Sequence, residues 1–199
     1  FVLPEFEQIR IPQWAARAEW FQGDSHLEFV WLPAPATDRI GKPGAEFYPY
    51  PPAITGLAYE IDGERRPSRR FSNGGFGLRA STLIDGWDLS AFVYRSPDSS
   101  ATFYRTILDA PIATAIYQLR FDLITRVGGT LAKDFGSIVL KGEAVYTHGR
   151  DFYVTTPTDS DGVVPQNTVD WALGLDFSLP AETRLNVQLF QRVFFDYNP

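Results

Sequence analysis

Apolar and polar residues alternate one by one along eight segments of the chain. In the first segment, Ala18 and Trp20 would lie on one face of a strand and Glu19 on the other. Alternation with a period of two is typical of a strand with one buried face, so the pattern predicts an all-β protein. The predicted strands cover residues 14–21, 26–32, 76–84, 87–94, 117–127, 138–147, 169–179 and 184–193.

The connections between these segments are alternately short and long. Asp85-Gly86 is one of the short ones, and Asp-Gly is a favoured two-residue hairpin turn. Outer-membrane barrels have short periplasmic turns at one end and long extracellular loops at the other. The order of connections therefore predicts one antiparallel, up-and-down transmembrane β-barrel domain over residues 1–199. The short turns are expected at 22–25, 85–86, 128–137 and 180–183, and the long loops at about 33–75, 95–116 and 148–168.

The apolar face is interpreted as the lipid face. The segments are 7 to 11 residues long, close to the roughly 9–11 that a tilted strand needs to span a bilayer. A soluble sandwich or lipocalin-like barrel, with its charged face in water, is the competing interpretation. Aromatic side chains on the apolar face gather near both segment ends, which favours the membrane because a bilayer selects aromatic girdles. The predicted girdles are Trp14, Trp31, Phe76, Tyr117, Tyr146 and Trp171 at the loop end, and Trp20, Trp87 and Phe177 at the turn end.

The charged residues of the segments all lie on the opposite face, which suits a hydrated barrel interior. In a wide barrel, a sector with Arg79, Arg120 and Arg126 would carry net positive charge against Asp88 and Asp122 and would set solute selectivity. Equally, neighbouring strands could simply pair their charges. The predicted lumen-lining cations are Arg17, Arg79, Arg120, Arg126, Lys141, Arg184 and Arg192, and the anions are Glu19, Glu28, Asp88, Asp122, Glu143, Asp170 and Asp176.

Composition narrows the function classes further. The 199 residues are 15% aromatic, which excludes a disordered chain, and the net charge of −6 argues against a nucleic-acid partner. Without cysteine there are no disulfides and no thiolate zinc site, and two histidines offer little for a metal, so no metal or cofactor is expected. No segment is long and apolar enough for a transmembrane helix. The chain has no methionine, and both its ends are predicted to lie on the loop side, so we expect a slice of a larger barrel.

A basic run in the longest loop is the first candidate for a local site. Arg65, Arg66, Arg69 and Arg70 could contact lipopolysaccharide phosphates or fold into the lumen to select anions. The alternative is a solvated loop whose charge is offset by the acids of residues 60–64.

Three further positions have weaker candidate chemistry. Asp159-Ser-Asp-Gly162 is similar to a calcium loop but lacks the later bidentate Glu, so it is interpreted as a turn. His148, near Asp151 and Asp98, could belong to a hydrolase at the extracellular rim, but nothing marks a nucleophile and no enzyme is expected. His26 points inward and is expected to pair with Glu19 or Glu28.

Several motifs in residues 8–106 resemble a known family. They are Arg10-Ile-Pro-Gln-Trp14, Leu32-Pro33, Arg39-Ile-Gly-Lys-Pro-Gly-Ala-Glu-Phe47, Gly75-Phe-Gly-Leu-Arg79, Asp85-Gly-Trp-Asp-Leu89 and Tyr94-Arg95. They are similar to the middle of large, porin-like Gram-negative outer-membrane proteins that are labelled as a domain of unknown function.

This resemblance implies an integral protein of the bacterial outer membrane, with more strands on both sides and no catalytic residues to transfer. Its expected function is that of a passive channel or uptake barrel for small or amphipathic solutes. The alternative is a structural or scaffold barrel in an outer-membrane complex, without transport. The expected partners are outer-membrane lipid, lipopolysaccharide, the barrel-assembly machinery and, in a complex, other subunits.

Overall fold

The computed structural model describes residues 13–38, 41–46, 48–51, 54, 56–108, 111–156 and 159–195. Residues 10–12, which begin the first resembling motif, and the chain ends at 1–4 and 196–199 lie outside this part. No helix in the described part has the length and apolar character needed to cross a bilayer.

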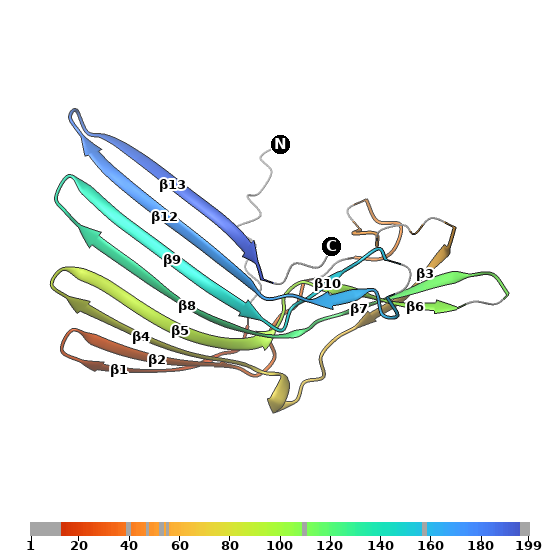
Figure 1. The fold of residues 1–199 in the computed structure, drawn as a ribbon. Coiled ribbons are helices and arrows are strands. Elements are labelled where there is room, and N and C mark those ends of the chain that lie inside the picture. The colour runs from red at the N-terminus through yellow and green to blue at the C-terminus, as the bar shows by residue number, and fades with distance from the viewer. Residues whose placement is uncertain are drawn as a thin grey trace.

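One antiparallel sheet of eight strands dominates the fold (Figure 1). Each strand pairs with the next in chain order, apart from the extra strands that the long loops contain. The four tight turns lie at one end of the sheet and the long loops at the other. The strands across the sheet are β1 (Ala16–Gln22), β2 (Ser25–Leu32), β4 (Gly75–Ile84), β5 (Trp87–Pro97), β8 (Leu123–Asp134), β9 (Ile138–His148), β12 (Thr168–Leu179) and β13 (Thr183–Phe194).

Seven of the eight predicted strands coincide with a strand of this sheet, and the all-β prediction is confirmed. The turn predicted at Asp85-Gly86 is also confirmed, since both residues have the positive φ angles (50° and 76°) that a type I′ hairpin turn requires. The predicted strand over 117–127 is wrong. The chain leaves one strand at Arg120 and enters β8 only at Leu123, so two strands divide this segment.

The turn predicted over 128–137 is present but shorter, at residues 135–137, because β8 continues through Gly128 and Gly129 to Asp134. These glycines are packing positions. A Cβ on Gly128 would lie 2.6 Å from the Ala144 carbonyl oxygen and 2.8 Å from the Phe92 ring. Gly128 therefore provides the space in which the Phe92 ring lies against the sheet, an arrangement known for glycines in curved sheets.

The strand registers place the predicted apolar residues of the large sheet on one face. Val93 is opposite Val127, which is opposite Tyr146, and the same alignment continues through the other pairs of strands. A slip of one residue in any pair would reverse the faces of every following strand. The prediction of one apolar and one charged face is therefore confirmed for the seven predicted strands that coincide with a strand of this sheet, and β8 continues the same two faces.

The long loops form two small sheets at the loop end of the large one (Figure 1). The first contains β3 (Ala58–Arg65), β7 (Thr114–Arg120) and β6 (Thr102–Leu108), with β3 parallel to β7. The second pairs β10 (Asp151–Tyr153) with β11 (Val163–Pro165), and a short 3₁₀ turn, η2 (Phe71–Asn73), precedes β4. The buried apolar cluster of the described chain lies in the first small sheet: Phe103, Ala115, Tyr117 and Leu119.

The large sheet is open in the described residues. β1 pairs only with β2 and β13 only with β12, so one edge of each outer strand is free, and no closed barrel is present. Most of each face is also uncovered; at the loop end, Phe71 of η2 packs on the apolar face, with its ring 5.0 Å from the Phe76 ring.

Candidate functional site

The charged face of the large sheet is the first candidate site. Most predicted lumen residues lie on it, and several form ion pairs, as one of the two interpretations expected. No ion pair within the described residues involves Arg79, Asp88 or Glu143. The pairs are Arg17 with Glu19 (2.6 Å) and Glu28 (2.9 Å), Lys141 with Asp176 (2.6 Å), and Arg192 with Asp170 (2.5 Å).

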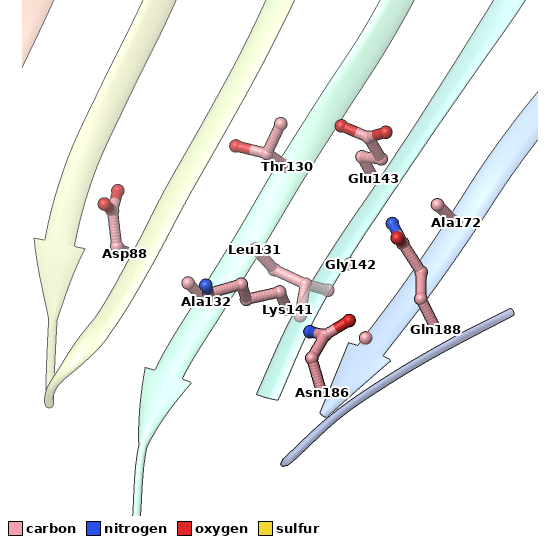
Figure 2. A pocket seen from close by; sticks show the side chains of 11 residues that line it. Asp88, Thr130, Leu131, Ala132, Lys141, Gly142, Glu143, Ala172, Asn186 and Gln188 are labelled. Carbon is pink, nitrogen blue, oxygen red and sulfur yellow. The ribbon is translucent and has the colours of Figure 1, made fainter. Parts of the chain in front are cut away.

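A hollow of about 430 Å³ lies on this charged face between β5, β8, β9, β12 and β13. Figure 2 shows Asp88, Thr130 and Glu143 on the same side of the sheet as Asn186 and Gln188. Small residues of the neighbouring strands, among them Ala132, Ala172 and Gly174, leave the space open. The hollow can hold water and small polar solutes between hydrogen-bonding side chains.

Three residues predicted to lie on the strands of the large sheet belong instead to the small sheet or to the link that follows it. Arg120 ends β7, Asp122 lies in the link between β7 and β8, and Tyr117 is buried in the small sheet with 4% of its surface exposed. The predicted positive sector therefore loses Arg120 and Asp122, and the loop-end girdle loses Tyr117. The cause is the break after Arg120, since the alternation of residues 117–120 belongs to the small sheet.

The other predicted girdle residues lie near the ends of the large sheet or, for Trp14, just before β1. Two cations on the apolar face also lie close to strand ends: Arg95 at the loop end and Lys133 at the turn end. Lys133 Nζ lies 5.0 Å from the centre of the Trp87 ring, a cation–π contact. Aromatic rings with cations at the edges of an apolar band are typical of a membrane interface.

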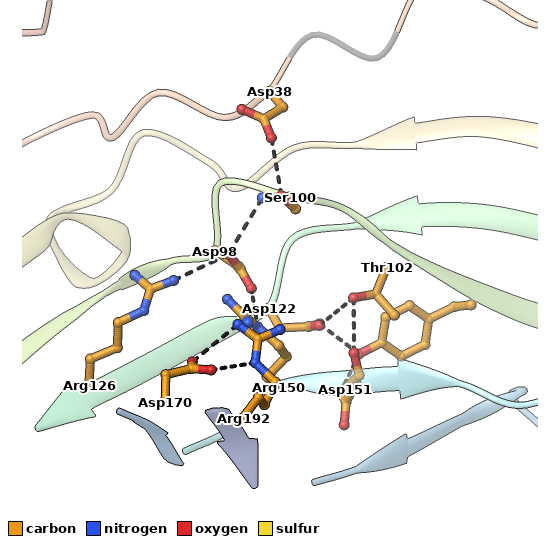
Figure 3. Close-up of polar contacts among 11 residues, drawn as sticks. Asp38, Asp98, Ser100, Thr102, Asp122, Arg126, Arg150, Asp151, Asp170 and Arg192 are labelled. Atoms are coloured by element: carbon orange, nitrogen blue, oxygen red, sulfur yellow. Dashed lines mark hydrogen bonds and ion pairs between the residues drawn. The ribbon is translucent and has the colours of Figure 1, made fainter. Parts of the chain in front are cut away.

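A second candidate site is a polar cluster where the large sheet meets the loops (Figure 3). Asp98, just after β5, is 4% exposed, and its carboxylate lies 2.6 Å from Arg150 Nε and 3.6 Å from an Arg126 nitrogen. The Asp98 N–H also donates to the Asp122 carbonyl oxygen (2.7 Å). A buried carboxylate between two guanidinium groups fixes the loops to the ends of β5 and β8, because removal of either cation would leave a charge poorly compensated.

Within this cluster, the Tyr104 hydroxyl lies between two carboxyl groups, 2.7 Å from Asp122 Oδ1 and 2.5 Å from Asp151 Oδ2. A phenol has one proton to donate, so both contacts are hydrogen bonds only when one carboxyl group is protonated. Burial raises the pKa of Asp122, which favours the neutral acid there. Burial raises the pKa of Tyr104 too, so the phenol keeps its proton.

The predicted basic run begins at Arg65, the last residue of β3. Arg66 connects loop segments, because its nitrogens lie 2.5 Å from Thr37 Oγ1 and 2.7 Å from a Glu64 oxygen. Arg65 is opposite Arg120 in the pairing of β3 with β7. Arg69 is exposed on the same loop. The members of the run therefore have different surroundings. Arg66 is held by the loops, Arg65 is opposite the like charge of Arg120, and Arg69 is solvated.

The histidines have ordinary partners. His148 Nδ1 lies 2.8 Å from Asn167 Oδ1, whereas Asp98 and Asp151, the acids considered for a hydrolase, contact other groups. His26 Nε2 lies 3.0 Å from Glu19 Oε1, as predicted.

Some polar residues of the loop end were not expected from the sequence. Arg105 on β6 is 2% exposed and donates to the carbonyl oxygens of Thr156 and Asp159, both at 2.7 Å. The loop considered for calcium forms a turn in which Asp159 Oδ1 accepts from the Gly162 N–H (2.7 Å). The only signal in the sequence for this buried arginine was its position, as a charged residue within the alternating pattern of residues 102–108.

Comparison of the chain with protein-family models, curated proteins and solved structures finds no match in any of the three. The resemblance to porin-like barrels therefore stays a prediction from the sequence. The functional argument rests on the two faces of the large sheet and on the loop end.

Proposed function

We propose that this chain forms part of the wall of a bacterial outer-membrane β-barrel that acts as a passive channel for small or amphipathic solutes. The observation that supports this most directly is the large sheet itself, which has one continuous and largely uncovered apolar face and one charged face.

The exposed apolar face needs a partner. Val127, Leu173 and Leu189 are 49%, 43% and 63% exposed, and they belong to a surface that extends over all eight strands. Soluble monomers rarely expose an apolar patch larger than a few hundred Å², because each Å² left in water costs about 25 cal/mol. Lipid is the partner that accepts such a band with polar and aromatic residues at its rims.

The stagger of the strands also supports a barrel wall. The row of paired residues that begins at Gln22, the last residue of β1, reaches Leu189, six residues after the start of β13. The turn ends therefore shift steadily across the sheet. Such a shift is what strands tilted in a closed barrel require, because tilt and register are linked.

The charged face is suited to a lumen that water and solutes can enter. It provides the hollow near Asp88 and Glu143 together with charges that have no ion-pair partner in the described chain, such as Arg79. Charges in a confined space act more strongly on passing ions than charges on an open surface.

The test is single-channel recording in planar bilayers with the full-length gene product that contains this chain. We expect conductance, and we expect Arg79→Gln to shift the reversal potential toward cations across a salt gradient. Lys42→Gln is the matched control, because Lys42 is an exposed loop residue whose neutralisation removes the same charge. Absence of conductance in the parent protein would contradict the channel.

The ion pairs within the charged face favour a second candidate. A lumen whose charges are largely paired between strands suits a scaffold barrel in an outer-membrane complex. A protein that folds in vesicles without conducting would favour this role.

A further inference from the structure

Three arginines from distant parts of the chain converge at the loop end. Arg65 and Arg66 lie at the end of β3 and just after it, and Arg120 is the last residue of β7. The parallel pairing of β3 with β7 places Arg65 directly opposite Arg120. All three line one hollow of about 460 Å³ beside the start of β8.

The direct pairing of Arg65 with Arg120 is unfavourable by itself. Like charges opposite each other on neighbouring strands destabilise a sheet. In the described residues, no ion pair joins Arg65 or Arg120 to an acid. An anion between the two guanidinium groups would remove the repulsion.

Two of the three arginines, Arg120 and Arg66, are also held in place. Arg120 Nε donates to Gln118 Oε1 (2.9 Å), and its guanidinium lies 4.6 Å from the centre of the Tyr104 ring. Arg66 is held by Thr37 and Glu64, as described above. Fixed guanidinium groups lose less side-chain entropy when they bind an oxyanion.

The rest of the hollow is compatible with an anion. Ser68 and Asn73 contribute polar groups, and Phe121 also lines the hollow. Asp122 is the one acid among the lining residues, and its oxygens accept from Thr102 (3.0 Å) and contact the Tyr104 hydroxyl, as described above. Because burial raises the pKa of Asp122, its negative charge is weakened.

We propose that Arg65, Arg66 and Arg120 form a binding site for a phosphate group, either on a free solute or on the headgroup of lipopolysaccharide. One guanidinium group can bind two phosphate oxygens at once. The hollow also has room for a sugar that carries the phosphate. The site does not require the barrel to conduct, so it goes beyond the proposed channel.

The experiment is isothermal titration of the detergent-solubilised full-length protein with inorganic phosphate at low ionic strength. A parallel arm measures binding to phosphatidylcholine vesicles with and without lipopolysaccharide. We expect Arg65→Gln and Arg120→Gln each to weaken binding about tenfold or more. Arg69→Gln is the matched control, since Arg69 belongs to the same basic run but does not line the hollow.

Stability provides a second readout. If the site is built for an anion, Arg65→Gln should raise thermal stability without phosphate and reduce the stabilisation that phosphate gives. Binding of inorganic phosphate supports a free solute, and binding only to lipopolysaccharide vesicles assigns the site to the lipid. The proposal is overturned if neither probe binds, or if Arg69→Gln weakens binding as much as Arg65→Gln.

Discussion

Replacement of Leu173 by arginine is the sharpest test of which face of the sheet meets lipid. Leu173 lies on the apolar face in the middle of β12, a strand of 12 residues. At about 3.4 Å per residue and a tilt of about 40°, such a strand spans about 31 Å along the membrane normal. Leu173 would then lie close to the bilayer midplane.

Arginine at the midplane of a barrel's lipid face costs about 2–4 kcal/mol. At about 1.36 kcal/mol per factor of ten, Leu173→Arg should lower the folding equilibrium constant about 30- to 900-fold. Gln188→Arg is the control at a similar depth on the other face. Gln188 is opposite Gly174 and lines the hollow on the charged face, so a longer polar side chain has space there without entering the apolar face.

The assay is urea-dependent folding of the full-length protein into phosphatidylcholine vesicles, followed by the mobility shift of unboiled samples. Leu173→Arg should move the transition to lower urea, whereas Gln188→Arg should leave it nearly unchanged. The opposite order would mean that the two faces are reversed. Two small and equal effects would mean that the sheet does not enter the bilayer.

Three further predictions concern packing, pH and edges. Gly128→Ala should lower the free energy of unfolding by about 1–3 kcal/mol, because the added Cβ would overlap Ala144 and Phe92. Gly174→Ala should be tolerated, because its Cβ would lie 3.9 Å from the nearest atom; urea transitions of both variants test this. Because the pKa of Asp122 is raised, the loop cluster should lose stability as pH rises above 3.8, the usual pKa of an aspartate. Hydrogen exchange between about pH 4 and 8 measures this loss, and Asp122→Asn should remove the dependence of stability on pH. Residues 1–199 expressed alone should not give a heat-modifiable monomer in detergent, because β1 and β13 would leave open edges in lipid; a fast-migrating, protease-resistant species would contradict this.

The large sheet could be predicted because its information is local. Alternation fixes which residues share a face, and Asp85-Gly86 fixes a turn, so neither depends on distant contacts. The errors lie where the local signal is ambiguous. The alternation of residues 117–120 fits a small loop-end sheet equally well. Glycine is common in turns, but Gly128 serves as a packing site within β8.

The loop-end sites could not be predicted, because they depend on long-range contacts. Arg65 meets Arg120 only through the parallel pairing of β3 with β7, and Asp98 meets Arg150 from a different loop. Short polar segments such as β10 have too few residues for a periodic signal. The basic run was visible in the sequence, but not which of its members would share a hollow.

The location of the buried core bears on the choice between a soluble and a membrane protein. Alternation alone is the same in both, since each needs strands with one apolar face. In a soluble sandwich, that face would be covered by a second layer and would form the core. Here the buried cluster around Phe103 and Leu119 lies in the loop-end sheet, while the far larger apolar face of the eight-stranded sheet stays open. A chain that buries its small sheet and exposes its large one has the distribution expected when lipid, rather than a second protein layer, covers the large sheet.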